Sequence, residues 1–214
     1  MYSFVIPCYN SSESIRHVVE LTMEEMEKMN RREFEFVLVN DYSSSTKTMP
    51  VLKKLAEEYP CVTVLNLAKN AGQHNAIMAG LNYAKGDILI GMDDDMQTHP
   101  SQLPYLFEEL EKGYDIVYGY YPEKKHSAFR NFGSWVNYIS VRILIGKPKE
   151  LKTSSYWVAR KFVRDSVIEY QAPYAYIQGL FLRTTRNISC IPIQHFQREE
   201  GESNYTFKRL LKLW

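Results

Sequence analysis

The sequence predicts an α/β protein with a Rossmann-like, mainly parallel central sheet and helices on both faces. Over the first 120 residues, apolar runs typical of buried strands alternate with helical patterns, as expected for successive β-α-β units. Polar residues also follow four successive strands, at the edge where open α/β sheets bind ligands. The 214 residues are enough for one large domain with a sizeable core.

The first five strands are predicted from short apolar runs, and four helices are predicted between them. The expected strands are Tyr2–Pro7, Phe34–Asn40, Val62–Leu67, Asp87–Met92 and Asp115–Tyr120. The expected helices are Glu13–Met29, Met49–Tyr59, Gln73–Ala84 and Pro100–Lys112. Asn10 is expected to cap the first helix, with Glu13 reaching back to it. Lys85 and Gly86 are expected to end the third helix.

The second part of the chain has a less regular pattern. It predicts a helix over Ser127–Ile145, a strand over Ser155–Ala159, a helix over Phe162–Tyr170 and a strand over Ile188–Ile193. The polar stretch "YYPEKKHS" at 120–127 is interpreted as a loop. Because neither a repeat nor a low-complexity linker interrupts the chain, we expect one domain.

Composition limits the class of protein. Lys plus Arg number 26 and Asp plus Glu number 25, so the chain lacks the basic excess typical of nucleic-acid binding. The three cysteines are widely spaced, which fits neither a disulfide framework nor a metal knuckle and favours a reducing compartment. The sequence starts directly in a strand, without a signal-peptide pattern. It ends on the basic, amphipathic "FKRLLKLW", and we expect a longer protein.

Polar side chains gather where the first four strands end. They are Pro7, Tyr9 and Asn10; Asn40 and Asp41; Lys69, Asn70 and Gly72; and Asp93, Asp94 and Asp95. Each group alone is an ordinary turn composition. Because the carboxyl ends of parallel strands meet at one edge, the four groups together predict a single crevice.

The triplet "DDD" at 93–95 predicts a cation site. No glycine-rich phosphate loop follows the first strand, so the phosphates of a nucleotide would have to be neutralised in another way. Asp93 and Asp95 would point to the same side if the chain were extended there. Mg²⁺ or Mn²⁺ prefers such oxygen ligands. The alternative is an acidic cluster before the helix at Pro100, stabilised by the helix dipole.

Other residues that metal or sugar sites often use have more ordinary interpretations. His74, His99, His126 and His195 lack helical metal-ligand spacing, and we expect them on the surface or in turns. Trp157 is interpreted as a core residue, with stacking on a sugar ring as the alternative.

Several motifs in order resemble a known enzyme family. "VIPCYN", "VNDYSSS", "KNAGQHNAIMAGLNYAKGD", "DDDMQTHP" and "REEGESNY" resemble the inverting family 2 glycosyltransferases of the GT-A fold, in particular the polyprenyl-phosphate subgroup that includes dolichol-phosphate mannose synthase. The resemblance covers essentially the whole chain. It implies a nucleotide-sugar-binding half at 1–120. The acceptor-side half would lie at 121–214 and continue into membrane-associated segments.

The resemblance also implies roles for individual residues. Contacts to the nucleotide or donor would come from Pro7, Tyr9, Asn10, Asn40, Asp41, Lys69, Asp93 and Asp94. Asn40 stands where the family usually has an acid, and Lys69 where it often has Arg. Asp93 and Asp95 would hold Mg²⁺ or Mn²⁺. Asp93, Asp95, Gln97 and Arg198 would be the catalytic set, with Arg198 and Ser203 closing over the diphosphate or the acceptor phosphate.

One departure from the family bears on the acceptor. Many inverting relatives place an Asp as general base where this chain reads "ELKTSSYWVARK", so that Glu150 is the nearby acid. A hydroxyl acceptor needs a base, whereas a lipid phosphate is already an anion, although Glu150 or an aspartate of the triplet would also serve. The expected reaction moves a sugar from a nucleoside-diphosphate sugar, with UDP slightly favoured, to polyprenyl phosphate at the cytoplasmic face of a membrane. A saccharide or other hydroxyl acceptor, and a non-catalytic nucleotide-sugar binder, remain alternatives.

Overall fold

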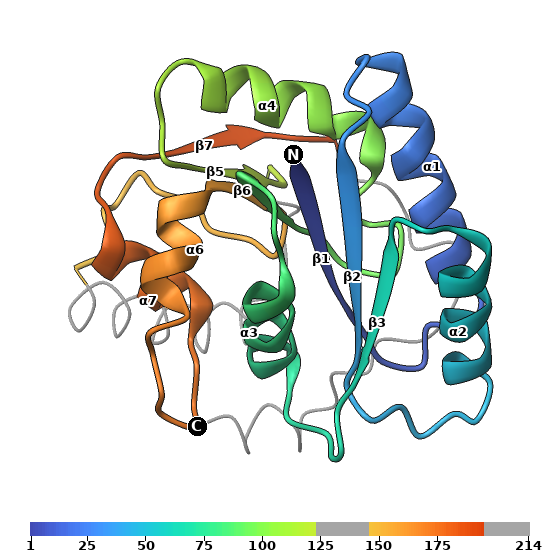
Figure 1. The fold of residues 1–214 in the computed structure, drawn as a ribbon. Coiled ribbons are helices and arrows are strands. Elements are labelled where there is room, and N and C mark those ends of the chain that lie inside the picture. The colour runs from blue at the N-terminus through green and yellow to red at the C-terminus, as the bar shows by residue number, and fades with distance from the viewer. Residues whose placement is uncertain (123–145, 195–214) are drawn as a thin grey trace.

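The computed structural model describes residues 1–122 and 146–194. Its centre is a seven-stranded sheet in the order β3-β2-β1-β4-β6-β5-β7 (Figure 1). The strands are β1 (Tyr2–Cys8), β2 (Phe34–Asn40), β3 (Val62–Asn66), β4 (Ile88–Gly91), β5 (Ile116–Tyr120), β6 (Trp157–Arg160) and β7 (Ile188–Pro192). All seven strands that the sequence predicts are confirmed apart from small shifts at their ends.

The sheet is mainly parallel, as predicted. β1 pairs in parallel with β2 and with β4, β2 with β3, and β5 with β7. β6 is antiparallel to both of its neighbours, β4 and β5. The start of β6 therefore lies at the same edge as the carboxyl ends of β4 and β5, which brings the segment before β6 to the predicted crevice.

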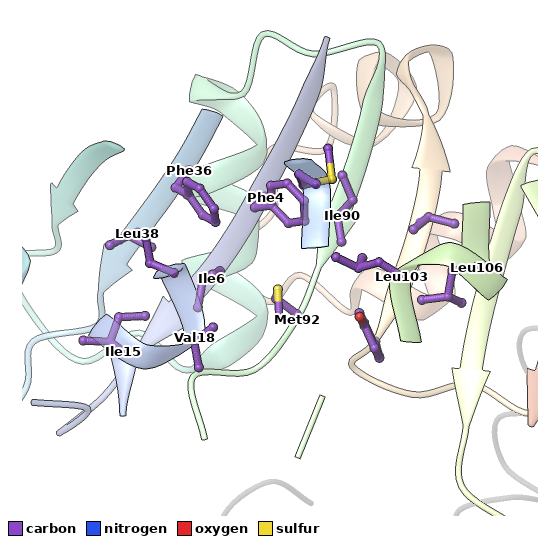
Figure 2. Packing of buried hydrophobic residues seen from close by; sticks show 14 of the residues in the cluster. Phe4, Ile6, Ile15, Val18, Phe36, Leu38, Ile90, Met92, Leu103 and Leu106 are labelled. Carbon is purple, nitrogen blue, oxygen red and sulfur yellow. The ribbon is translucent and has the colours of Figure 1, made fainter. Parts of the chain in front are cut away.

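Helices cover both faces of the sheet. They are α1 (Ile15–Lys28), α2 (Thr48–Glu58), α3 (Gln73–Tyr83), the short 3₁₀ helix η1 (Pro100–Gln102), α4 (Leu103–Glu111), α6 (Lys161–Val167) and α7 (Ile177–Thr184). One apolar cluster joins one face of the sheet to α1, α2 and α4, and Figure 2 shows Phe4, Ile90 and Leu103 within it. A second cluster joins the other face to α3, α6 and α7.

Two predicted helix ends have a different structural basis. Asn10 does not cap α1, because it adopts a left-handed φ of 61° and its side chain bonds to Ser44 and Ser45 instead. The α3 helix ends at Tyr83 in extended backbone rather than in a glycine cap. Gly86 is required by the close approach of β1, since a Cβ there would lie 2.6 Å from Ser3 Oγ.

Two helices remain to be compared with the sequence prediction. The α7 helix was not predicted, and the helix expected over Ser127–Ile145 lies outside the described residues. In the described parts of the chain, no helix combines the length and the apolar character needed to cross a bilayer.

Candidate active site

The three consecutive aspartates after β4 point to three different partners. The Asp93 carboxylate accepts a hydrogen bond from Gln73 Nε2 at 2.8 Å and another from the Ser155 hydroxyl. Gln73 begins α3 and Ser155 precedes β6. Two elements distant in sequence therefore fix the orientation of Asp93.

Asp94 binds the loop that follows β1. Its carboxylate accepts hydrogen bonds from the Tyr9 backbone amide at 3.2 Å and from the Ser11 hydroxyl, and its carbonyl accepts one from the Ser14 hydroxyl. Burial raises the pKa of Asp94 to about 6, the bonds from Ser11 and Tyr9 oppose this rise, and the charge of Asp95 adds to it. Asp94 remains a predicted donor contact, and the structure shows that it joins two loops of the crevice.

Asp95 lies in a sharp bend, so the extended chain that would point Asp93 and Asp95 to the same side is not present. The bend covers residues 94–98, and Met96 has a φ of 64°. Asp95 Oδ1 accepts a hydrogen bond from the Gln97 amide at 3.1 Å, and the Tyr121 hydroxyl donates one to the Gln97 carbonyl at 2.6 Å. Burial and the charges of Asp93 and Asp95 raise the pKa of Tyr121. Both carboxylates therefore act electrostatically on the Tyr121 hydroxyl.

The donor set suits a hard divalent cation that also binds phosphate. Within residues 1–122 and 146–194, no three His, Cys, Asp or Glu side chains form a group able to hold a metal ion. Mg²⁺, however, is usually held by one or two carboxylates together with waters and substrate phosphates. Asp93 and Asp95 supply only oxygen atoms and both act on Tyr121. They fit the expected Mg²⁺ or Mn²⁺.

Asp41 fixes the loop that follows β3. The residue is buried, and its carboxylate accepts hydrogen bonds from the Ala71 amide at 2.7 Å, the Gly72 amide at 2.9 Å and Asn70 Nδ2 at 3.1 Å. Burial raises its pKa, and the bonds from Ala71 and Gly72 oppose this rise. Asp41 thus shapes the wall of the crevice between β2 and β3.

Neighbouring amides and hydroxyls complete this wall. Asn40 Nδ2 donates to Asn66 Oδ1 at 2.7 Å, and Asn40 Oδ1 accepts from the Ser43 amide at 3.2 Å. The Asn10 amide donates to Ser43 Oγ at 3.0 Å. These bonds tie the ends of β1, β2 and β3 together, so Asn10 and Asn40 serve the framework of the predicted nucleotide wall.

The remaining predicted site residues are Pro7, Tyr9, Lys69, Arg198 and Ser203. Pro7 and Tyr9 are half-buried at the end of β1, and Lys69 is exposed in the loop after β3. Arg198 and Ser203 lie outside the described residues. Their expected contacts to a phosphate stay predictions.

Sequence reasoning did not single out Gln73, Ser155 or Tyr121. Gln73 stands inside "KNAGQHNA", and Tyr121 inside the polar stretch that we interpreted as a loop. Their common signal is a polar side chain at the start or end of an element on the carboxyl edge. Ser155 carries this signal because it precedes an antiparallel strand, whose direction the sequence did not reveal.

The histidine and tryptophan interpretations can be compared with the structure. His99 caps η1 by accepting a hydrogen bond from the Ser101 amide, which confirms a turn role. His74 is half-buried against Tyr176, with 5.3 Å between ring centroids, and burial lowers its pKa. Trp157 is 1% exposed and packs edge-on against Phe181, so it is a core residue. His126 and His195 lie outside the described residues.

Sequence comparison places most of this chain in one family model. Residues 3–170 match the model described as Glycosyl transferase family 2. The chain is also 32% identical over 217 residues to the undecaprenyl-phosphate 4-deoxy-4-formamido-L-arabinose transferase of Edwardsiella ictaluri. That match covers 99% of this chain and 65% of the relative, so the chain spans about two thirds of the relative's length.

Solved structures share the fold at low sequence identity. Glucosyl-3-phosphoglycerate synthase from Mycobacterium tuberculosis, solved with Mn²⁺ and UDP-glucose, has a TM-score of 0.62 at 18% identity, covering 98% of this chain and 73% of that one. TarS from S. aureus, solved with UDP, has a TM-score of 0.56 at 18% identity, covering 89% and 57%. These matches confirm the predicted GT-A architecture.

Proposed function

Because this chain belongs to glycosyl transferase family 2, we propose that it transfers a sugar from a nucleoside-diphosphate sugar to a polyprenyl phosphate, with inversion at the anomeric carbon. UDP is the favoured carrier. The observation that carries this proposal is the position of the aspartates after β4, where Gln73, just beyond the loop after β3, binds Asp93 and the loop after β1 binds the adjacent Asp94. The name of the Edwardsiella relative, an undecaprenyl-phosphate sugar transferase, supports the lipid acceptor.

The residues around the bend explain how a donor would be held. Gln73 and Ser155 fix Asp93 from two sides, and the Gln97 amide fixes Asp95. A divalent cation bound to these carboxylates would offset the charge on the departing diphosphate. With the carboxylates held by neutral donors, little reorganisation is needed when substrate arrives.

The transfer is a single displacement. A lone pair of the acceptor phosphate oxygen forms the new bond to the anomeric carbon. The bond from that carbon to the donor phosphate breaks, and its electron pair leaves with the nucleoside diphosphate. No proton has to be removed from the acceptor, because a phosphate is anionic at neutral pH. Arg198, expected from the late motif, would balance this charge.

The position of Glu150 supports a phosphate acceptor. The Cys190 thiol, on β7, donates a weak bond to the Glu150 carbonyl at 3.7 Å. β7 is three strand positions from β4, which corresponds to about 14 Å. Glu150 is therefore poorly placed to act as a base beside Asp93, and an acceptor that needs no base fits the described residues better.

A bilayer-embedded acceptor also suggests where the reaction occurs. We expect the enzyme at the cytoplasmic face of a membrane, with residues 121–214 on the acceptor side and residues 1–120 on the donor side. The protein should then float with anionic liposomes, and salt should weaken this association.

The decisive experiment is a donor and acceptor screen. The protein is incubated with Mn²⁺, a panel of nucleotide sugars, and either undecaprenyl phosphate or soluble saccharides, and products are identified by mass spectrometry. We expect a lipid-phosphate sugar. Efficient transfer to a soluble saccharide, with no response to the lipid phosphate, would instead establish the hydroxyl-acceptor reaction. Nucleotide-sugar binding without any transfer would indicate a non-catalytic binder.

Variants of the two carboxylates test the metal role in the same assay. Asp93→Asn and Asp95→Asn should each lower turnover at least about 100-fold, and EDTA should do the same to the wild type. The thermal unfolding midpoint should change little. Asp165→Asn, which removes a surface ion pair on α6, is the matched control. Full activity in EDTA would contradict the metal role.

A further inference from the structure

Tyr42 has an unusual backbone conformation for an exposed aromatic residue. It follows Asp41 at the carboxyl end of β2, its φ is 52°, and 57% of the residue is exposed. Within the described residues, the other non-glycine residues with positive φ are Asn10, Asn30 and Met96. Asparagine tolerates this conformation, and Met96 is anchored by burial in the core. Neither reason applies to Tyr42.

Bonds on both sides of Tyr42 hold it in this strained conformation. The Asp41 amide donates to the Cys8 carbonyl at 2.9 Å, and its carboxylate is bound by the loop after β3. The Ser43 amide donates to Asn40 Oδ1, and Ser43 Oγ accepts from the Asn10 amide. Because both neighbours are anchored, Tyr42 cannot relax to a common conformation without breaking these bonds. Strain that surrounding structure maintains is typical of functional positions.

The position of Tyr42 matches one end of a nucleotide. β2 is two strand positions from β4 in the sheet order, which corresponds to about 10 Å along the carboxyl edge. Under the proposed function, the diphosphate lies beside Asp93 and Asp95. Because Tyr9 and Asp41 are the expected nucleotide contacts, the nucleoside would extend along this edge past the Tyr9 loop, toward the end of β2.

We propose that Tyr42 is the platform on which the base of the nucleoside diphosphate stacks, and this inference rests on the proposed function. An aromatic ring offers a flat apolar face to any base, and stacking adds affinity without reading base identity. The anchored backbone fixes the residue that carries the ring at the carboxyl end of β2 before substrate arrives. Tyr42 would thus set affinity for the nucleoside, while the aspartates set affinity for the diphosphate.

The test compares the binding of nucleotides and of pyrophosphate by the wild type and by two Tyr42 variants. Calorimetry in Mn²⁺ measures the dissociation constants of UDP, GDP, CDP and TDP, and of inorganic pyrophosphate, for Tyr42→Gly, Tyr42→Phe and the wild type. Tyr105→Ala is the matched control, because Tyr105 on α4 is 58% exposed. We expect Tyr42→Gly to weaken the best nucleotide about tenfold or more, and to leave pyrophosphate binding unchanged. Tyr42→Phe and the control should bind as the wild type does.

The thermal unfolding midpoint separates this role from a structural one. Glycine adopts a φ of 52° without strain, so Tyr42→Gly should unfold at the same or a higher temperature while it binds nucleotide less tightly. Lower stability together with weaker binding of pyrophosphate would indicate a structural role and overturn the inference. An unchanged dissociation constant for the nucleotides would also overturn the inference. It would leave the proposed function intact. If the wild type binds none of the four nucleotides, the proposed function fails and the inference fails with it.

Discussion

The Tyr9 backbone amide donates a hydrogen bond to the Asp94 carboxylate at 3.2 Å, although 85 residues separate them in the chain. The Ser11 hydroxyl donates to the same carboxylate oxygen. These bonds explain how three adjacent aspartates are tolerated after a buried strand. Asp93 turns toward α3 and β6, Asp94 toward the loop after β1, and Asp95 closes its own bend. Each carboxylate thus has its own hydrogen-bond donors.

The Asp94–Ser11 bond should be visible as an energetic coupling. Asp94→Ala and Ser11→Ala each leave a polar partner unpaired, and each should lower the free energy of unfolding by about 1–3 kcal/mol. The double variant should lose less than the sum, with a coupling of at least about 0.5 kcal/mol in urea unfolding. Asp94→Ala also relieves the repulsion between the Asp94 and Asp95 carboxylates. The single and the double Asp94 variants share this effect, so it cancels in the coupling. Additive losses would show that the bond contributes nothing to stability.

Asp41 should affect both stability and donor binding. Asp41→Ala removes the acceptor for the Ala71 and Gly72 amides, so the loop after β3 should lose order. We expect the free energy of unfolding to fall by about 1–3 kcal/mol and nucleoside diphosphate binding to weaken. Urea unfolding and calorimetry measure the two effects. Asp87→Ala, which removes an exposed ion pair with the N-terminus, should change stability by less than about 0.5 kcal/mol. Equal effects of the two variants would contradict the role of Asp41.

His74 should make stability depend on pH in a predictable direction. Burial lowers its pKa in the folded state, so the unfolded chain binds a proton more readily. Stability from this residue is therefore fully present above the unfolded pKa of about 6.5 and is lost as the pH falls below it. Between pH 7.5 and 5.5, the wild type should lose more unfolding free energy than His74→Phe does. Identical slopes for wild type and His74→Phe would refute this assignment.

Gly91 should not tolerate a side chain. A Cβ at this position would lie 2.2 Å from Trp157 Cε2, inside a core where Trp157 is 1% exposed. Gly91→Ala should therefore lower the free energy of unfolding by about 1–3 kcal/mol. In a Trp157→Leu background the same change should have a smaller effect, because the ring that clashes is gone. Urea unfolding of the four proteins checks this, and an equal effect in both backgrounds would rule out the clash as the cause.

The sequence predicted the elements with strong local patterns. β1 to β5 and the helices between them follow from apolar runs and helical periodicity, and their polar ends predicted the crevice. The α7 helix was missed because Ile177–Thr184 combines a glycine with residues that also favour strands. The partners of Asp93 were missed for another reason. Ser155 meets Asp93 only because β6 inserts antiparallel between β4 and β5, and local patterns do not encode strand direction.

Because β6 is inserted antiparallel beside β5, the length of the connection between these two strands should have little effect on the stability of the sheet. Tyr118 of β5 pairs with Trp157 of β6, so the segment between these strands leaves the sheet and re-enters it at adjacent positions. Closing a flexible loop between fixed neighbouring ends depends only weakly on its length, by about 0.6 kcal/mol for each doubling. A change in the length of this connection therefore carries little entropic penalty when Tyr121 and Ser155 keep their contacts at the crevice. An acceptor specificity could be grafted at this point while the donor half keeps its register.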